Sequence, residues 1–146
     1  AATVEEVKGR LAALRADTPR RWGTMTSHQM LCHVADAFAA AVGELEVRPL
    51  RTALGSTVMK WGALWMPLRW PHGVPTRAEI DPTRRGTQPA AFEADRVRVL
   101  ELMARFVREA GSDPEAIHVL FGRLTRREWL RWGWLHTDHH LRQFGV

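Results

Sequence analysis

Residues 125–143 read TRREWLRWGWLHTDHHLRQ, and this stretch decides the fold class. Thr125 followed three residues later by Glu128 has the form of a capping box, which begins a helix. When the stretch is projected at 100° per residue, apolar and histidine side chains share one face, and charged side chains fall opposite. The stretch therefore predicts an amphipathic helix whose inner face includes histidines. That face carries Trp129, Trp132, Gly133, His136, His140, Gln143 and Phe144.

Three further main helices are predicted by the same signals. Thr3 with Glu6 and Thr26 with Gln29 again have the capping-box spacing, and each pair precedes apolar residues at helical intervals. A third apolar stripe begins near Phe92 and is ended by a glycine of the kind that follows helices. The predicted bounds of these helices are residues 3–18, 26–43 and 92–111.

The middle of the chain predicts a helical segment and then a long loop. From Leu50 to Leu68 apolar residues keep a period near 3.6, although Gly55 and Gly62 weaken the pattern. Prolines and glycines then interrupt residues 69–89, and a connection of this length is more often a lid or binding loop than idle chain. No strand is predicted. The expected architecture is all-α: one domain, residues 1–146, folded as a four-helix bundle with an extra helical segment and a long Pro-rich loop between helices two and three.

Composition excludes several classes of protein. The lone Cys32 rules out an internal disulfide and a cysteine cluster for zinc. The net charge is +5, but basic residues alternate with acidic ones along the predicted helices and no nucleic-acid motif accompanies them, so we expect no nucleic-acid partner. The sequence has no run of eighteen apolar residues and no signal-peptide pattern at its start. We expect a cytoplasmic protein with no membrane partner.

The histidines provide the candidate site. Of seven histidines, only His136 and His140 have the i, i+4 spacing that places two imidazoles on one inward helix face. In the second helix His33 shares a face with Ala37 and Ala40, whose small side chains allow another helix to approach closely. Buried imidazoles need partners for their nitrogens, and a metal ion provides one directly. The sequence thus predicts a divalent metal site formed by His33, His136 and His140.

Other polar residues receive weaker predictions. Asp36 and Gln29 flank His33 and are candidates to accept hydrogen bonds from the ligand imidazoles. Gly133, one turn before His136, is a candidate to line a substrate pocket. No general acid or base can be assigned, since Asp36 is the only carboxylate near the site by projection. Cys32 projects away from His33 and is a poor ligand.

The remaining histidines are predicted to lie outside the site. His28 and His72 are expected on the surface or in loops, His118 is expected to bond the local backbone, and His139 lies about 60° from the metal-binding face. The alternative for the site itself is metal-free. In that case, the buried histidines would hydrogen-bond to a carboxylate or a carbonyl.

The chain resembles the DinB/YfiT-like superfamily of metal-dependent helical bundles in two stretches, QMLCHVAD at residues 29–36 and HTDHHLRQ at residues 136–143. Residues 121–129 are similar, more narrowly, to a subgroup of that superfamily whose function is unassigned. The resemblance implies a four-helix bundle whose metal is held by His33, His136 and His140, with His139 not a ligand. It also implies a homodimer. Characterised members are thiol transferases and thiol-dependent isomerases, and others are described as metal-dependent hydrolases.

The function predicted from the sequence is therefore that of a metal-dependent enzyme. Three histidines leave a coordination position open, as catalytic sites do. A divalent ion there (Zn, Ni, Mn or Fe, not distinguished by the sequence) would activate a water or a low-molecular-weight thiol for transfer or hydrolysis on a small-molecule substrate. The alternative is a noncatalytic helical module that binds a small ligand or a partner through its tryptophan-lined loop. The sequence identifies neither the reaction nor the role of the loop from Arg69 to Pro89.

Overall fold

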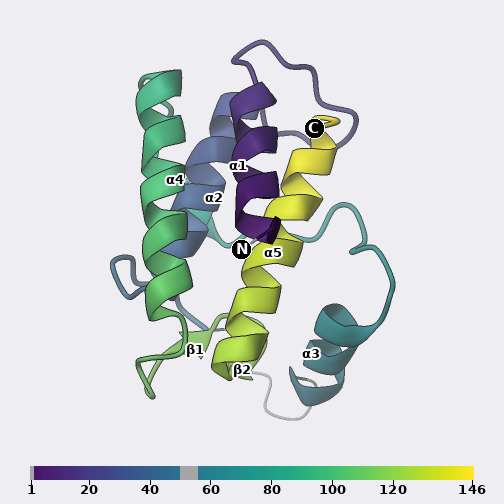
Figure 1. Ribbon diagram of the computed structural model, residues 1–146, viewed down its shortest axis with the longest axis vertical. Helices are drawn as coiled ribbons and strands as arrows, with labels where there is room; N and C mark the ends of the chain where they lie inside the picture. The colour runs from purple at the N-terminus through teal and green to yellow at the C-terminus, as the bar shows by residue number, and fades with distance from the viewer. Residues whose placement is uncertain (1, 50–55) are drawn as a thin grey trace.

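The chain is mostly helical in the computed structural model, which describes residues 2–49 and 56–146 (Figure 1). This confirms the predicted all-α class. Two short antiparallel strands also form, with Ile117 paired to Arg123, and they were not predicted because two-residue strands leave no alternating pattern. The elements are α1 (Ala2–Ala13), α2 (Ser27–Ala41), α3 (Ser56–Trp65), the 3-10 helix η1 (Ala78–Ile80), α4 (Phe92–Glu109), β1 (Ile117–His118), β2 (Gly122–Arg123) and α5 (Arg126–Gln143).

Capping boxes begin α2 and α5 as predicted. The Thr26 hydroxyl accepts from the N–H of Gln29 and the Gln29 side chain bonds back to the Thr26 N–H, and Thr125 and Glu128 are paired in the same way. Each box satisfies backbone N–H groups that have no partner within the helix, so it fixes the residue at which the helix begins. The prediction for Thr3 was wrong, because α1 already includes Ala2 and Thr3 lies inside the helix.

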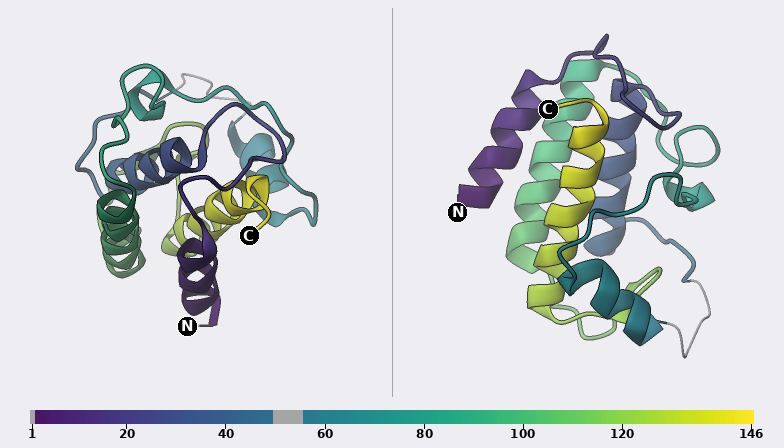
Figure 2. Two further views of the ribbon diagram at one scale, coloured as in Figure 1. Left: turned by 90° about the horizontal axis from the view of Figure 1, so that it is seen from above. Right: turned by 90° about the vertical axis from the view of Figure 1, so that its right-hand side faces the viewer.

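Helices α1, α2, α4 and α5 run alongside one another, and α3 lies outside them near the start of α5 (Figures 1 and 2). The most extensive contact joins α2 to α4, while α5 touches α1, α2 and α3. Along α2 nearly every residue from Met30 to Ala39 is buried, which explains its almost continuous apolar sequence. The fully buried core side chains include Leu11, Leu14, Met30, Leu31, Val34, Phe38, Val99 and Leu141.

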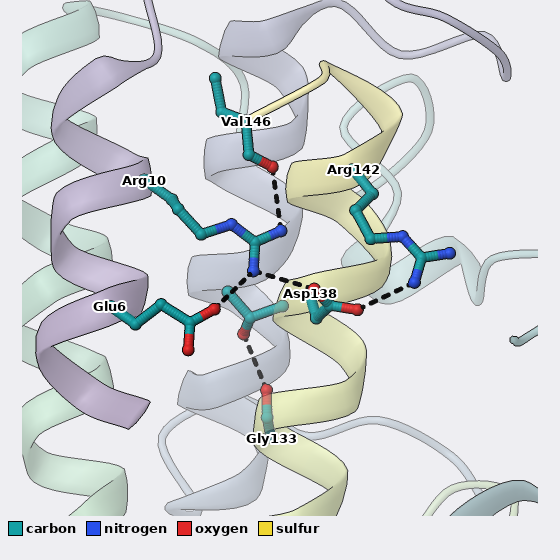
Figure 3. A network of polar contacts seen from close by, with 7 residues as sticks. Glu6, Arg10, Gly133, Asp138, Arg142 and Val146 are labelled. Carbon is teal, nitrogen blue, oxygen red and sulfur yellow. Dashed lines mark hydrogen bonds and ion pairs between the residues drawn. The ribbon is translucent and has the colours of Figure 1, made fainter. Parts of the chain in front are cut away.

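An arginine of α1 holds that helix against α5 (Figure 3). The Arg10 guanidinium donates to the Asp138 carboxylate at 2.8 Å and to the carbonyl of Val146 at 2.9 Å. Arg142, one turn along α5, donates to the other Asp138 oxygen at 3.3 Å. Because Asp138 is engaged on this side of α5, it points away from the histidine face of the same helix, as the projection predicted.

Residues 66–91 connect α3 to α4 and contain only the short η1 turn, in agreement with the predicted Pro-rich loop. The predicted helical segment that precedes the loop is α3, which runs from Ser56 to Trp65. Its expected start at Leu50, and Gly55, lie outside the described residues. Within the described ranges, no helix is long and apolar enough to cross a membrane.

Candidate metal centre

The three predicted histidines meet between α2 and α5. His33 is buried on the inner face of α2, and His136 and His140 lie half-buried on the facing side of α5. Their ring centroids are 5.1 Å apart for His33 and His136, 4.7 Å for His33 and His140, and 4.8 Å for His136 and His140. One ligand atom from each residue lies within 4.8 Å of the other two. The structure thus brings together the set that helical projection predicted.

The closest pair of nitrogens has a separation suited to a shared cation. The Nε2 atoms of His33 and His136 are 3.1 Å apart. Two ligands placed about 2.05 Å from a tetrahedral zinc ion would be about 3.3 Å apart, so a small ion needs little movement of these rings. The same separation also suits a hydrogen bond in which one Nε2–H donates to the other ring.

A carbonyl fixes the tautomer of His33. Its Nδ1 lies 2.7 Å from the carbonyl oxygen of Ile80, at the end of η1. A carbonyl only accepts hydrogen bonds, so Nδ1 carries the proton and Nε2 presents a lone pair toward His136. This is the arrangement that ligating histidines usually have, with the second nitrogen donating to a backbone or side-chain oxygen.

A glutamine fixes the tautomer of His140 in the same way. The Gln143 side chain donates through Nε2 to the Trp22 carbonyl at 2.9 Å, and this bond orients the amide. Gln143 Oε1 then lies 3.2 Å from His140 Nδ1 and accepts from it. Because Nδ1 of His140 is protonated, its Nε2 is left with a lone pair. The sequence placed Gln143 on the histidine face but did not predict this role.

The ring of His136 stacks on Trp132, with centroids 5.3 Å apart and planes 16° from parallel. Its Nδ1 is buried and has no hydrogen-bond partner among the described residues. A buried imidazole with one unpartnered nitrogen is costly, so its other nitrogen needs a strong partner. Both a metal ion and the Nε2 of His33 would meet that need.

Burial keeps all three imidazoles neutral at physiological pH. Desolvation lowers the pKa of His33 and lowers the pKa values of His136 and His140 well below their usual range. Repulsion from the neighbouring imidazoles further lowers the pKa values of His136 and His140. Neutral imidazole is the form that binds metals, so no proton has to be displaced from the ligand nitrogens near pH 7.

Asp36 does not serve the histidines, and the prediction that it orients a ligand was wrong. Its buried carboxylate accepts from the N–H and the hydroxyl of Thr87, both at 2.7 Å, and from Arg98 at 3.1 Å. These bonds tie the end of the Pro-rich loop to α2. Gln29 is likewise occupied by the capping box of α2. The hydrogen bond from His33 is instead accepted by the Ile80 carbonyl, which no pattern of side chains in the sequence predicts.

Gly133 has a packing role rather than the predicted place beside the metal. A Cβ atom built on it would lie 2.5 Å from the Phe106 ring, so the glycine lets α4 and α5 approach each other. It also lines a cavity of about 540 Å³ bordered by α1, α4 and α5, and none of the three site histidines lines that cavity.

The other histidines have defined partners. His118 Nδ1 accepts from the N–H groups of Leu120 and Phe121, which confirms its predicted bonding to the backbone. His139 packs edge-on against Trp22 and lies outside the group formed by His33, His136 and His140, as the sequence predicted. His28 contradicts its prediction as a surface residue, because its side chain is largely buried and lies 2.6 Å from Asp95 Oδ2.

Cys32 belongs to a second polar group with His28 and Asp95, whose donor atoms lie within 4.8 Å of one another. His28 and Asp95 already satisfy each other, and Asp95 also accepts from the N–H of Ala90. Burial raises the pKa of the Cys32 thiol to about 12, so the sulfur stays protonated and unreactive. We assign this group to the contact between α2 and α4.

A second cavity, of about 290 Å³, is lined in part by residues that contact two of the three histidines. Ala37 and Ala40 line it from the same face of α2 that carries His33. Ile80 and Trp132, which touch His33 and His136 respectively, form further parts of its wall. None of the three site histidines is among its lining residues, so the cavity approaches the site through Ile80 and Trp132.

Fold and site define a helical protein in which two facing helices bring three neutral histidines together. The chain belongs to the family described as "protein of unknown function (DUF1569)", whose model matches residues 3–145. Comparison with curated proteins and with solved structures finds no match. The family description assigns no reaction, so the function has to be argued from the site.

Proposed function

We propose that this chain is a metal-dependent enzyme of the DinB/YfiT-like kind. In this proposal α1, α2, α4 and α5 form a four-helix bundle, and His33, His136 and His140 hold one divalent ion: zinc, nickel, manganese or iron. The observation that carries the proposal is the arrangement of lone pairs. His33 and His140 each have Nδ1 committed to an oxygen, and the Nε2 atoms of His33 and His136 are 3.1 Å apart.

The donor set favours a catalytic site over a structural one. Three protein ligands leave at least one coordination position open, whereas structural zinc sites are usually closed by four. A divalent ion at such a site would supply Lewis acidity and lower the pKa of a water or thiol that binds it. The proposed reaction is accordingly transfer of a low-molecular-weight thiol, or hydrolysis.

Residues of the chain would orient the ligands and shape the substrate space. The Ile80 carbonyl and the Gln143 amide hold the rings of His33 and His140, and Trp132 covers one face of His136. The second cavity is lined largely by alanine, isoleucine and tryptophan side chains and would take a small molecule. In the described part of the chain, no carboxylate forms a hydrogen bond or an ion pair with the three histidines, so we assign no general base.

Metal analysis tests the proposal. We expect purified protein, stripped with a chelator and reloaded, to bind about one equivalent of at least one of the four metals. His33→Ala and His140→Ala should each lose it, and His72→Ala, which removes an exposed histidine, should keep it. Failure of the wild-type protein to bind any of the metals at micromolar concentration would overturn the proposal and favour a metal-free histidine cluster.

The reaction is tested separately on metal-loaded protein. Screening thiols such as cysteine and glutathione with electrophilic acceptors, beside a panel of small esters and amides, should reveal turnover that His140→Ala lacks. Metal binding without any turnover would leave a ligand-binding module as the better description.

A further inference from the structure

Exposed hydrophobic side chains are concentrated on one segment of the molecule. Of the eight large hydrophobic residues exposed in the described ranges, six lie between residues 58 and 74. Trp61 is 61% exposed, a high value for a tryptophan. We call five of these residues the α3 patch: Val58, Met59, Trp61, Met66 and Leu68.

The α3 patch is a coherent face and not a scatter of side chains. At 100° per residue, Val58, Met59 and Trp61 fall within an arc of about 160°, and Met66 follows directly after the last residue of the helix. The opposite side of the helix carries Leu64, which is fully buried, and Lys60, which pairs with Glu128 at 3.1 Å. Among the described residues, helix α3 therefore has one side that packs on the protein and an apolar side that is exposed.

Contacts with α5 hold this helix in place. The guanidinium groups of Arg127 and Arg131 stack on the Trp65 ring, 4.8 and 4.9 Å from its centroid. Arg131 also donates to the Leu64 carbonyl. Figure 2 shows α3 on the outside of the bundle beside α5, and the exposed apolar side chains of α3 therefore form a preformed surface.

The same segment also carries basic residues without any acidic ones. Residues 47–78 contain five basic residues and no acidic one, whereas the remaining 114 residues contain sixteen of each. The whole net charge of +5 therefore falls within this segment. Arg69, next to Leu68, is exposed, and so is Arg127 of α5, which stacks on Trp65.

We propose that the α3 patch binds the surface of an anionic lipid bilayer. An apolar helix face that carries a tryptophan, continued by Met66 and Leu68 just beyond the helix and flanked by the cations Arg69 and Arg127, resembles the pattern of helices that lie in the membrane interface. Trp61 would sit at the level of the headgroups, and Arg69 would meet lipid phosphates. This proposal replaces the expectation from sequence that no membrane is involved, and it does not depend on the proposed metal site.

Charge also argues against the obvious competitor, a second copy of the chain. A twofold interface brings the same patch of each copy together, so Arg69 and Arg127, which lie beside the patch, would face the same two cations of the other copy. Anionic lipid supplies the missing negative charge. Nucleic acid would supply it too, but offers no surface that buries a face of valine, methionine and leucine.

Vesicle sedimentation tests the proposal. At 0.1 M salt the full chain should pellet with vesicles of phosphatidylcholine containing 30% phosphatidylglycerol, and should stay in the supernatant with phosphatidylcholine alone. The double variant Trp61→Ser/Leu68→Ser should bind at least ten-fold more weakly. Val97→Ser, which removes a similarly exposed apolar side chain from α4, should bind as the wild type does.

A second variant isolates the electrostatic part. Arg69→Gln should weaken binding about five-fold, since each basic residue near an anionic surface contributes about a factor of that size. Arg108→Gln, an exposed arginine of α4, should have little effect. Light scattering on the same proteins serves as the counter-test. A wild-type dimer that Trp61→Ser/Leu68→Ser converts to a monomer, with no vesicle binding, would overturn the proposal, as would equal binding to neutral and anionic vesicles.

Discussion

The Nε2 atoms of His33 and His136 lie 3.1 Å apart although 103 positions separate the two residues in the chain. Both nitrogens belong to imidazoles that burial keeps neutral, and His33 is held as the Nδ1–H tautomer by a carbonyl. Two capped helices that face each other across the core are sufficient to produce this contact. Its value for function depends on whether a proton or a metal ion lies between the rings.

Zinc should stabilise the wild-type protein and leave His136→Ala unaffected. A ligand that binds only the folded state at about 100 times its dissociation constant contributes about 2.7 kcal/mol, which corresponds to a rise in Tm of about 5 to 10 °C for a chain of this size. Thermal unfolding followed by circular dichroism, with zinc and with a chelator, measures this. Identical melting curves for the wild-type protein in both buffers would contradict the prediction.

Gln143→Leu should weaken metal binding about 10- to 100-fold while the three ligands stay in place. The substitution removes the acceptor for His140 Nδ1, and loss of such partners typically has an effect of this size. Gln143→Glu is the matched control, because its carboxylate still accepts from His140 but no longer donates to Trp22. Competition with a chromophoric chelator gives both affinities, and equal losses in the two variants would point to a purely structural role.

The three candidate histidines could be predicted from the sequence because their positions follow from helical geometry. The capping boxes at Thr26 and Thr125 fix where α2 and α5 begin, and the 3.6-residue period then determines which side chains point inward. The partners of the ligands were not predictable in this way. Ile80 contributes a main-chain carbonyl from an irregular loop, and a carbonyl is common to all residues.

Asp36 and Gly133 show where helical projection fails. Both lie on the predicted faces, but projection gives a direction and not a partner. Asp36 accepts hydrogen bonds from Thr87 and Arg98, and the sequence did not predict that these two residues lie next to α2. Gly133 packs directly against the Phe106 ring of α4, which the sequence also did not predict. Long-range packing decided both cases.

Asp36→Ala should destabilise the fold by about 2 to 4 kcal/mol. The substitution leaves the N–H of Thr87 and the guanidinium of Arg98 without their buried acceptor. Removing only one partner of a buried network lowers stability strongly because the remaining polar groups stay unsatisfied. Urea unfolding measures the loss, and Asp17→Ala, an exposed aspartate, should change stability by less than about 0.5 kcal/mol. A similar effect of the two substitutions would show that the loop is not anchored through Asp36.

Two glycine substitutions should change the stability of the fold in opposite directions. Gly133→Ala forces its methyl group against the Phe106 ring and should cost about 1 to 3 kcal/mol of stability. Gly9→Ala, in α1 where a Cβ atom meets nothing within 4 Å, should stabilise by about 0.5 to 1 kcal/mol. Both variants should keep their metal affinity. Loss of metal from Gly133→Ala alone would restore the idea that this glycine lines the site.

His118 should make the protein less stable in acid. Burial lowers its pKa to about 3 in the folded state, whereas the unfolded chain takes up the proton near pH 6.5. The contribution of His118 to the free energy of unfolding should therefore be fully present above pH 6.5. It should fall by about 1.4 kcal/mol per pH unit as the pH drops toward 3. His118→Asn, which can still accept from the backbone, should lose about 2 kcal/mol less than the wild type between pH 7 and pH 5 in chelator. Parallel pH profiles from urea titrations would exclude His118 as a contributor.

The bond from His33 to the Ile80 carbonyl has an evolutionary consequence. Main-chain groups are the same whatever residue is encoded, so the codon at position 80 can drift without disturbing the tautomer of His33, provided the turn keeps its shape. Selection on this contact would act on the length and curvature of the loop rather than on residue identity. Among descendants of this gene, insertions and deletions near η1 would be purged, while a substitution at position 80 would leave the tautomer of His33 unchanged.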